Sequence, residues 1–188
     1  MITVVSGLPR SGTSLMMQML AAGGMEVLTD GQRASDADNP KGYYELEKVK
    51  RLKEDSAWLA DAEGKAIKVV SPLLYDLPAG YRYRVIFMKR HLDEILASQR
   101  KMLAQRKTDD GQTEDPRMRV HFAVHLNRLE KWLPTATHMD VLYCDYNELM
   151  ENPAFVAEQV ACFLGCDLDV ERMSRVVDAA LYRNRQAR

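Results

Sequence analysis

Residues 4–20 read VVSGLPRSGTSLMMQML, and this stretch decides the fold class. A β-branched run is followed by a turn with two glycines and then by apolar residues at helical spacing, which predicts a strand, a loop and a helix. Gly7 and Gly12 stand five positions apart, as in the Gly-x-x-x-x-Gly pattern of phosphate-binding loops. Such a loop points backbone N–H groups and the positive end of a helix at an anion. We therefore predict a phosphate site in this loop.

The loop differs from the phosphate-binding loop of nucleotide triphosphatases in its charged residue. Thr13 stands where those enzymes carry the lysine that reaches the terminal phosphates, and Ser14 follows where their hydroxyl holds Mg²⁺. The nearby cation is Arg10, at the apex of the loop, and Ser11 adds a further hydroxyl. The pattern favours binding of one phosphate, without the lysine that nucleotide triphosphatases use for metal-assisted triphosphate chemistry. The alternative is that this stretch has no ligand and is only a tight strand-to-helix turn with an exposed arginine.

The composition is that of an ordinary globular protein. The chain has 188 residues, of which 46% are hydrophobic and 28% charged, so we expect one domain over residues 1–188. A net charge of −1 argues against general nucleic-acid binding, which usually needs a basic excess. No apolar run approaches the length of about 18 residues that a membrane span requires. The three cysteines lack a paired metal spacing, which favours buried thiols in a reducing, cytoplasmic compartment.

Strand and helix patterns alternate along the chain. The strand patterns are short apolar runs, most of them β-branched, and lie at Ile2–Ser6, Met25–Leu28, Ala66–Val70, Arg84–Lys89 and Met139–Cys144. The helical patterns have apolar residues at three- and four-residue spacing and lie at Thr13–Ala22, Glu45–Ala62, Leu92–Gln105, Arg117–Leu133 and Ala154–Leu164. Strands separated by helices imply right-handed crossovers and a parallel sheet. We therefore predict an α/β, three-layer P-loop-type fold with a parallel sheet of about five strands flanked by helices.

A second candidate phosphate site follows a later strand pattern. Arg90 comes at the end of this strand, at the edge of a parallel sheet where ligands bind, and Ser98 follows about two helical turns further on. The two side chains together suit one more phosphate, although an arginine after a strand is more often a solvated charge. The polar segment 104–118 contains Gly111 and Pro116, and it fits either a lid or an ordinary loop.

With both motifs in hand, the chain resembles the sulfotransferases that use 3′-phosphoadenosine 5′-phosphosulfate (PAPS). GLPRSGTS at residues 7–14 looks like that family's loop for the 5′-phosphate of the donor. RVIFMKRHLDEILAS at residues 84–98 is similar to its 3′-phosphate motif, in which an arginine and a serine stand eight apart. NPKGYYE at residues 39–45 and VLYCDYNELMENPAFVAEQVACFLG at residues 141–165 also resemble family segments, so the resemblance spans most of the chain.

The resemblance implies a role for each matched residue. Arg10 is expected near the oxygen that bridges the sulfate and the 5′-phosphate, where it would stabilise the leaving group. The other residues expected to hold the 5′-phosphate are Ser11, Gly12, Thr13 and Ser14. Arg90 and Ser98 would clamp the 3′-phosphate, with Arg183 or Arg185 of the basic C-terminal segment as additional cations. The transferred group carries less charge than a γ-phosphoryl, so fixed donors would suffice and no metal is expected.

The chain also departs from the family pattern. In AIKVVSPLL at residues 66–74, Val70 stands where many members have a catalytic histidine, although Lys68 and Pro72 match. Glu45 is our candidate for the missing base, with the first turn of a helix as its alternative role, and Lys68 is expected to assist the sulfuryl group. Leu15 stands where an aromatic residue commonly stacks on adenine, so that contact stays unassigned.

The function expected from these residues is sulfuryl transfer to the hydroxyl of a small molecule or a carbohydrate. A P-loop kinase or nucleotide triphosphatase is one alternative, and a domain that binds the donor without catalysis is another. His121 and His125 stand four apart on a helical pattern, but the sequence offers no third obvious metal ligand. We therefore expect packing or a contact with the acceptor from these histidines, and no metal site.

Overall fold

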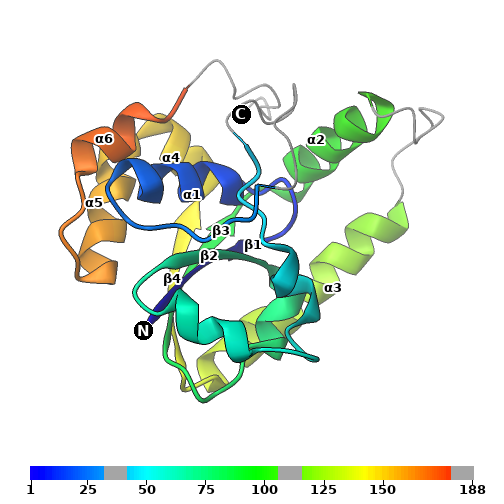
Figure 1. Ribbon diagram of the computed structural model, residues 1–188. Coiled ribbons are helices and arrows are strands. Elements are labelled where there is room, and N and C mark those ends of the chain that lie inside the picture. The colour runs from blue at the N-terminus through cyan, green and yellow to red at the C-terminus, as the bar shows by residue number, and fades with distance from the viewer. Residues whose placement is uncertain (32–41, 106–115, 179–188) are drawn as a thin grey trace.

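The described part of the chain folds around one parallel β-sheet. The computed structural model describes residues 1–31, 42–105 and 116–178. Within these residues the sheet has four strands, which are β1 (Ile2–Gly7), β2 (Ala66–Val70), β3 (Tyr83–Lys89) and β4 (Met139–Asp145). Their order is β2-β1-β3-β4 and every neighbouring pair is parallel, so the α/β class is confirmed. The edge formed by the strands' carboxyl ends carries the loop after β1 (Figure 1).

Helices cover both faces of this sheet. The α-helices are α1 (Thr13–Ala22), α2 (Leu92–Gln105), α3 (Pro116–Trp132), α4 (Tyr146–Glu151), α5 (Pro153–Leu164) and α6 (Val170–Arg175). Short 3₁₀ helices are η1 (Glu47–Arg51), η2 (Ala57–Ala62), η3 (Ser71–Asp76) and η4 (Leu133–Thr135). Figure 1 shows α1, α4, α5 and α6 on one side of the sheet and α3 with the 3₁₀ helices on the other. The layers therefore match the three-layer prediction.

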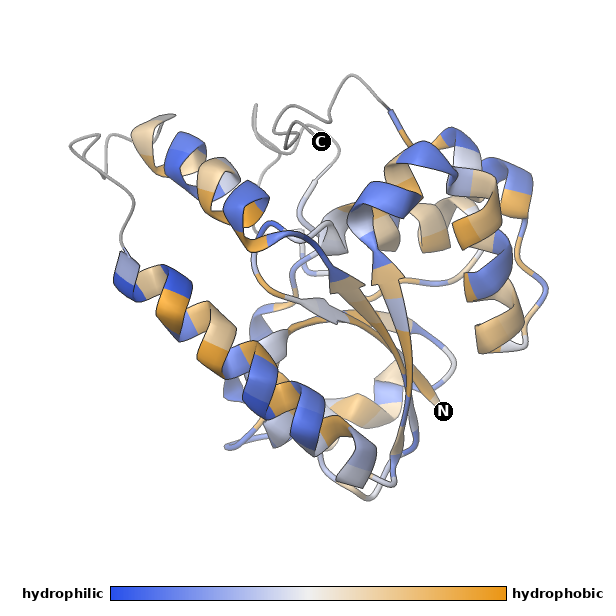
Figure 2. Cartoon of the chain, turned by 180° about the vertical axis from the view of Figure 1, so that it is seen from behind, coloured by the Kyte–Doolittle hydropathy of each residue, from blue (hydrophilic) through white to orange (hydrophobic). Residues whose placement is uncertain are grey.

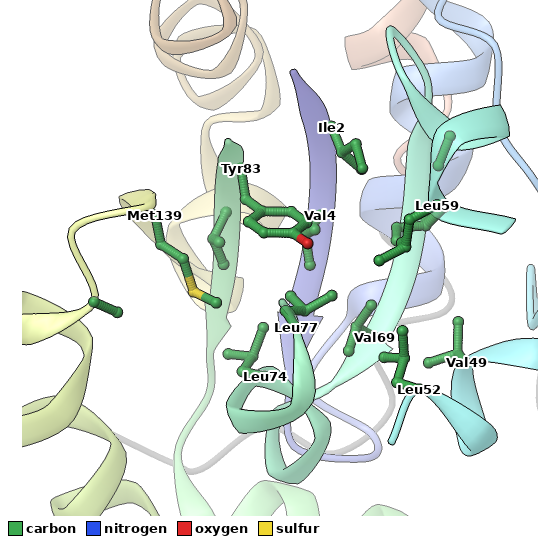
Figure 3. Close-up of a cluster of buried hydrophobic side chains, with 14 of the residues drawn as sticks. Ile2, Val4, Val49, Leu52, Leu59, Val69, Leu74, Leu77, Tyr83 and Met139 are labelled. Carbon is green, nitrogen blue, oxygen red and sulfur yellow. The ribbon is translucent and has the colours of Figure 1, made fainter. Parts of the chain in front are cut away.

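Two apolar cores lie on the two faces because successive strand residues point in opposite directions. Ile2 and Val4 of β1 point into the core beneath η1, η2, η3 and α3, which Figure 3 shows in close-up. Val5 points into the other core, between the sheet and α1, α4, α5 and α6. Burial on both faces explains why β1, β2 and β3 are largely apolar, whereas the edge strand β4 has exposed positions such as Asp140 and Tyr143. Figure 2 shows the apolar strands in orange.

Two predicted elements are corrected by the structure. Instead of a fifth strand at Met25–Leu28, Val27 forms one isolated parallel bridge with Ala66, so the described sheet has four strands. Glu45–Ala62 is not one helix but contains η1 and η2 as separate short turns. Between them the Asp55 carboxylate accepts a hydrogen bond from the Ala57 N–H at 3.0 Å. This side-chain contact starts a new turn, because it replaces the helical backbone partner of that N–H.

The cysteine prediction holds for one thiol and fails for two. Cys144 is buried on β4, and burial raises its pKa to about 12. Cys162 and Cys166 are exposed: the buried side of α5 is formed by other residues, including Val156 and Val160, and Cys166 lies beyond the end of that helix. None of the helices in the described ranges has the length and apolarity needed to cross a membrane.

Candidate active site

The loop after β1 has the backbone conformation of a tight turn at the start of a helix. Its glycines have positive φ angles, 148° at Gly7 and 102° at Gly12, and Arg10 at the apex also has a positive φ of 71°. The Ser11 N–H donates to the Leu8 carbonyl at 3.1 Å, which closes the turn. Gly12 then caps α1, so the first N–H groups of that helix point toward the loop. This is the arrangement that the glycine spacing predicts.

Close packing explains why glycine is needed at both positions. A Cβ atom on Gly7 would lie 2.8 Å from the carbonyl oxygen of Met88 on β3. A Cβ atom on Gly12 would lie 2.9 Å from Cε2 of Tyr146, and closer still to another atom of that ring. Real Cβ contacts are almost never this short. The loop is therefore pressed against the end of β3 and the start of α4.

Two buried hydroxyls at this end of β1 fit an anionic ligand. Ser6 Oγ and Ser11 Oγ are buried and have no hydrogen-bond partner among residues 1–31, 42–105 and 116–178. Burying an unsatisfied hydroxyl is costly, so such groups in native proteins usually have a functional reason. Ser11 stands directly before the N-terminus of α1, where the helix dipole favours negative charge. The residues of the loop thus fit a phosphate group.

The two predicted phosphate motifs are in direct contact. Arg10 Nε, from the loop, donates to Ser98 Oγ on α2 at 3.0 Å. Arg90, at the end of β3, donates from Nη1 to the carbonyl oxygen of Arg10 at 3.1 Å. Residues that are 80 and more positions apart in the sequence therefore meet at one edge of the sheet. This places both anion-binding candidates within the reach of one nucleotide.

Arg90 is held by side chains that the sequence analysis did not single out. Its Nε donates to Glu94 Oε2 at 2.9 Å, and the two side chains are only 7% and 2% exposed. Glu94 Oε1 also accepts a hydrogen bond from Asn147 Nδ2 on α4 at 3.3 Å. The Arg90 guanidinium lies 4.1 Å from the centre of the Tyr146 ring. An acid four residues after Arg90, in the first turn of the predicted helix Leu92–Gln105, was the available signal for this pair.

Lys68 of β2 reaches the first turn of α1. It is 8% exposed, and its Nζ donates to the Tyr43 carbonyl and to Ser14 Oγ, the latter at 3.4 Å. Ser14 occupies the position whose hydroxyl holds Mg²⁺ in nucleotide triphosphatases. The ammonium of Lys68 thus contacts the hydroxyl whose counterpart in those proteins holds a metal ion. Glu45 Oε1 lies 3.8 Å from the same Nζ, so the structure brings Glu45 and Lys68 together.

The other predicted residues are placed less directly. Val70, at the position of the family histidine, is partly exposed at the end of β2. The next residue, Ser71, has its Oγ 2.9 Å from His125 Nε2 on α3, a contact that the sequence did not predict. Arg183 and Arg185 lie outside the described residues, as does most of the segment 104–118. The described residues contain no group of three or more side chains suited to a metal ion.

Comparison with known proteins identifies the family. A model of the sulfotransferase domain family matches residues 2–188. The chain belongs to this family. Among solved structures, mouse sulfotransferase SULT7A1 complexed with PAP shows 15% sequence identity and a TM-score of 0.48. The match covers 94% of this chain, which spans only 62% of the mouse chain. No curated protein matches the sequence significantly.

The packing at Gly12 predicts a large cost for a small substitution. Gly12→Ala is expected to lower the free energy of unfolding by about 2–4 kcal/mol, because it combines backbone strain with overlap against Tyr146. Gly24→Ala is the matched control, since Gly24 has a similar φ of 97° but open space around it. Urea unfolding measures the free energy of unfolding of both variants. An equal decrease in the two would show that overlap with Tyr146 adds nothing to the cost of Gly12→Ala.

His125 predicts a dependence of stability on pH. Burial, and then the charge of His121, lowers the pKa of His125 below its ordinary value of about 6.5. The unfolded chain therefore binds a proton at this histidine more readily, so stability falls as the pH drops below about 6.5 toward the folded pKa. Ser71 and Tyr75 of η3 are its other neighbours.

We expect His125→Gln to lose part of this pH dependence. Melting temperatures measured from pH 7.5 to 5 give the test, with Val124→Ala on the same helix as a control that removes no titrating group. An unchanged pH profile in His125→Gln would contradict the assignment.

Proposed function

We propose that the protein is a sulfotransferase that moves a sulfuryl group from PAPS to an acceptor hydroxyl. The observation that carries this proposal is the contact between the two anion-binding motifs, in which Arg90 donates to the Arg10 carbonyl and Arg10 donates to Ser98. PAPS has phosphates on the 5′ and 3′ oxygens of a single ribose. A site for it needs two anion-binding groups side by side, and membership of the sulfotransferase family supports the same donor.

The loop is proposed to hold the 5′-phosphate. Backbone N–H groups at the start of α1 supply donors, together with the hydroxyls of Ser11, Thr13 and Ser14. Gly12 lets the loop backbone pack directly against the Tyr146 ring, which occupies the position that a Cβ atom would take. Arg10 is proposed to stabilise the negative charge that develops on the leaving phosphate oxygen. The buried Ser11 hydroxyl gains a hydrogen-bond partner in this arrangement.

The 3′-phosphate is proposed to bind beside α2. Arg90, at the end of β3, and Ser98, on α2, are proposed to bind this phosphate. Arg183 and Arg185 are proposed as additional cations. The 3′-phosphate distinguishes PAPS from ordinary adenine nucleotides, so these residues set the selectivity for the donor. A buried arginine is suited to this role because its planar guanidinium binds phosphate oxygens in pairs.

The chemical step is proposed as an in-line transfer without a metal ion. The acceptor oxygen forms a new bond to sulfur, the bond from sulfur to the 5′-phosphate oxygen breaks, and the acceptor proton passes to Glu45. Lys68 stabilises the negative sulfuryl oxygens and lies 3.8 Å from Glu45. The proposed acceptor is the hydroxyl of a small molecule or a carbohydrate.

A second candidate function is donor binding without catalysis. The observation that favours it is Val70 at the position of the family histidine, since a valine side chain cannot take a proton. A P-loop kinase or nucleotide triphosphatase is disfavoured, because the Lys68 ammonium at Ser14 repels a second cation where Mg²⁺ would bind. These alternatives predict different ligands and different turnover.

Ligand binding separates the donor proposal from the triphosphatase alternative. Without metal, 3′-phosphoadenosine 5′-phosphate at about 100 times its dissociation constant is expected to stabilise the protein by about 2.7 kcal/mol, which raises the melting temperature by several degrees. ATP with Mg²⁺ is expected to do much less. A thermal-shift comparison measures both, and stabilisation by ATP with Mg²⁺ alone would overturn the proposal.

Substitution of Glu45 tests the proposed base. Glu45→Gln is expected to lower kcat by about 10²–10⁴ and to leave the affinity for 3′-phosphoadenosine 5′-phosphate unchanged, because only the proton acceptor is lost. Glu47→Gln is the matched control, since Glu47 is an exposed acid two residues away that pairs with Lys50. Desulfation of PAPS is followed with a panel of hydroxyl acceptors.

The same assay distinguishes the remaining outcomes. Full activity in Glu45→Gln would show that another group accepts the proton. Donor binding with no turnover for any acceptor, in the unaltered protein, would favour the non-catalytic alternative.

A further inference from the structure

The apex of the phosphate loop is held in an unfavourable backbone conformation. Arg10 has a φ of 71°, in the left-handed region that non-glycine residues rarely adopt. Such a conformation persists only where surrounding contacts impose it. The Arg10 carbonyl accepts a hydrogen bond from Arg90 Nη1, and the Arg10 side chain donates to Ser98. The loop apex is therefore fixed from β3 and α2, which lie outside the loop.

Arg90 is in turn fixed by Glu94. Nε of Arg90 donates to Glu94 Oε2 at 2.9 Å, and the carboxylate is 2% exposed. A buried arginine with no counter-charge would pay a large desolvation cost and would turn toward solvent, so the acid keeps the guanidinium inside. Because Nε and Nη1 belong to one rigid plane, fixing Nε against Glu94 also aims Nη1 at the Arg10 carbonyl.

Glu94 is anchored at its other oxygen as well. Oε1 accepts from Asn147 Nδ2 on α4, and the neighbouring Tyr146 ring lies against the Arg90 guanidinium. The same ring fills the space beside Gly12. The loop is thus enclosed by one continuous network from α2, β3 and α4, and Glu94 is the acid at its centre.

We propose that Glu94 is a positioning residue that acts through Arg90 to hold the apex of the phosphate loop in its binding conformation. Its role is distinct from a contact with the 3′-phosphate, because the hydrogen bond that it supports ends on the loop backbone. Its consequence for the donor rests on the proposed function: Arg90 serves the 3′-phosphate site and the 5′-phosphate loop together. Loss of Glu94 therefore weakens the grip on the 5′-phosphate.

Hydrogen exchange in the ligand-free protein tests this role without any donor. In Glu94→Gln, which keeps the size of the side chain and removes its charge, the amides of residues 10–13 are expected to exchange about tenfold faster than in the unaltered protein. Amides of β1 and β3 are expected to keep their protection. Asp93→Asn is the matched control, because Asp93 is the adjacent acid on α2 and pairs with Arg119 of α3 instead.

Equilibrium binding then tests the consequence for the ligand. Affinities for 3′-phosphoadenosine 5′-phosphate and for adenosine 5′-monophosphate are measured by calorimetry for the same three proteins. Glu94→Gln is expected to weaken the binding of adenosine 5′-monophosphate about tenfold, since the loop holds the phosphate that the two ligands share, and to weaken the binding of 3′-phosphoadenosine 5′-phosphate by at least as much, since Arg90 also serves the 3′-phosphate. A loss of affinity for 3′-phosphoadenosine 5′-phosphate alone, with that for adenosine 5′-monophosphate unchanged, would overturn the proposal, because Glu94 would then act only at the 3′-phosphate.

The remaining outcomes are also decisive. Loop exchange equal to that of the unaltered protein, or faster exchange spread evenly over the whole sheet, would overturn the role of Glu94. Should Glu94→Gln fail to fold, Asn147→Ala removes one partner of the carboxylate and is expected to show a smaller acceleration in the same amides. If the unaltered protein binds neither nucleotide, the proposed function fails, while the exchange comparison still decides the role of Glu94.

Discussion

The hydrogen bond from Arg90 to the carbonyl of Arg10 is the contact on which the candidate site depends. It joins a loop that follows β1 to a side chain at the end of β3, and so makes one site of two motifs. The bond also compensates a backbone conformation that Arg10 would otherwise leave. Since both partners are arginines, their mutual repulsion has to be offset, and the buried carboxylate of Glu94 supplies the opposite charge.

The sheet supplies the geometry for this contact. Gly7 of β1 pairs with Met88 of β3 in the parallel register, so the chain leaves both strands at the same level. The loop after Gly7 and the turn after Lys89 then start side by side. A shift of this register by one residue would turn the side chains of the shifted strand to the opposite face of the sheet and would separate the two motifs. The apolar cores on both faces thus fix the relative position of two polar groups.

The sequence predicts the local parts of this site better than the distant ones. The spacing of Gly7 and Gly12 and the apolar runs on either side are local signals, and the loop and α1 follow them. The meeting of Ser14 with Lys68 depends on the pairing of β1 with β2, and the contact of Ser71 with His125 joins residues 54 apart. The spacing of apolar residues along the sequence does not report contacts between residues so far apart. The pattern at Met25–Leu28 failed for a related reason: its pairing with β2 is limited to one bridge, between Val27 and Ala66, and a local apolar run does not report how far such pairing extends.

The position of Lys68 also bears on why this loop has lost the usual lysine. In nucleotide triphosphatases the cations at the phosphates are a loop lysine and a Mg²⁺ ion held by the following hydroxyl. Here Thr13 replaces the lysine, and an ammonium from β2 reaches the hydroxyl of Ser14. A protein ammonium carries half the charge of Mg²⁺ and stays in place between turnovers. A sulfuryl group carries less negative charge than a γ-phosphoryl, so a weaker and permanent cation matches it. Two fixed cations, Arg10 at the loop apex and Lys68 on the neighbouring strand, thereby suit the charge of the group that we propose is transferred.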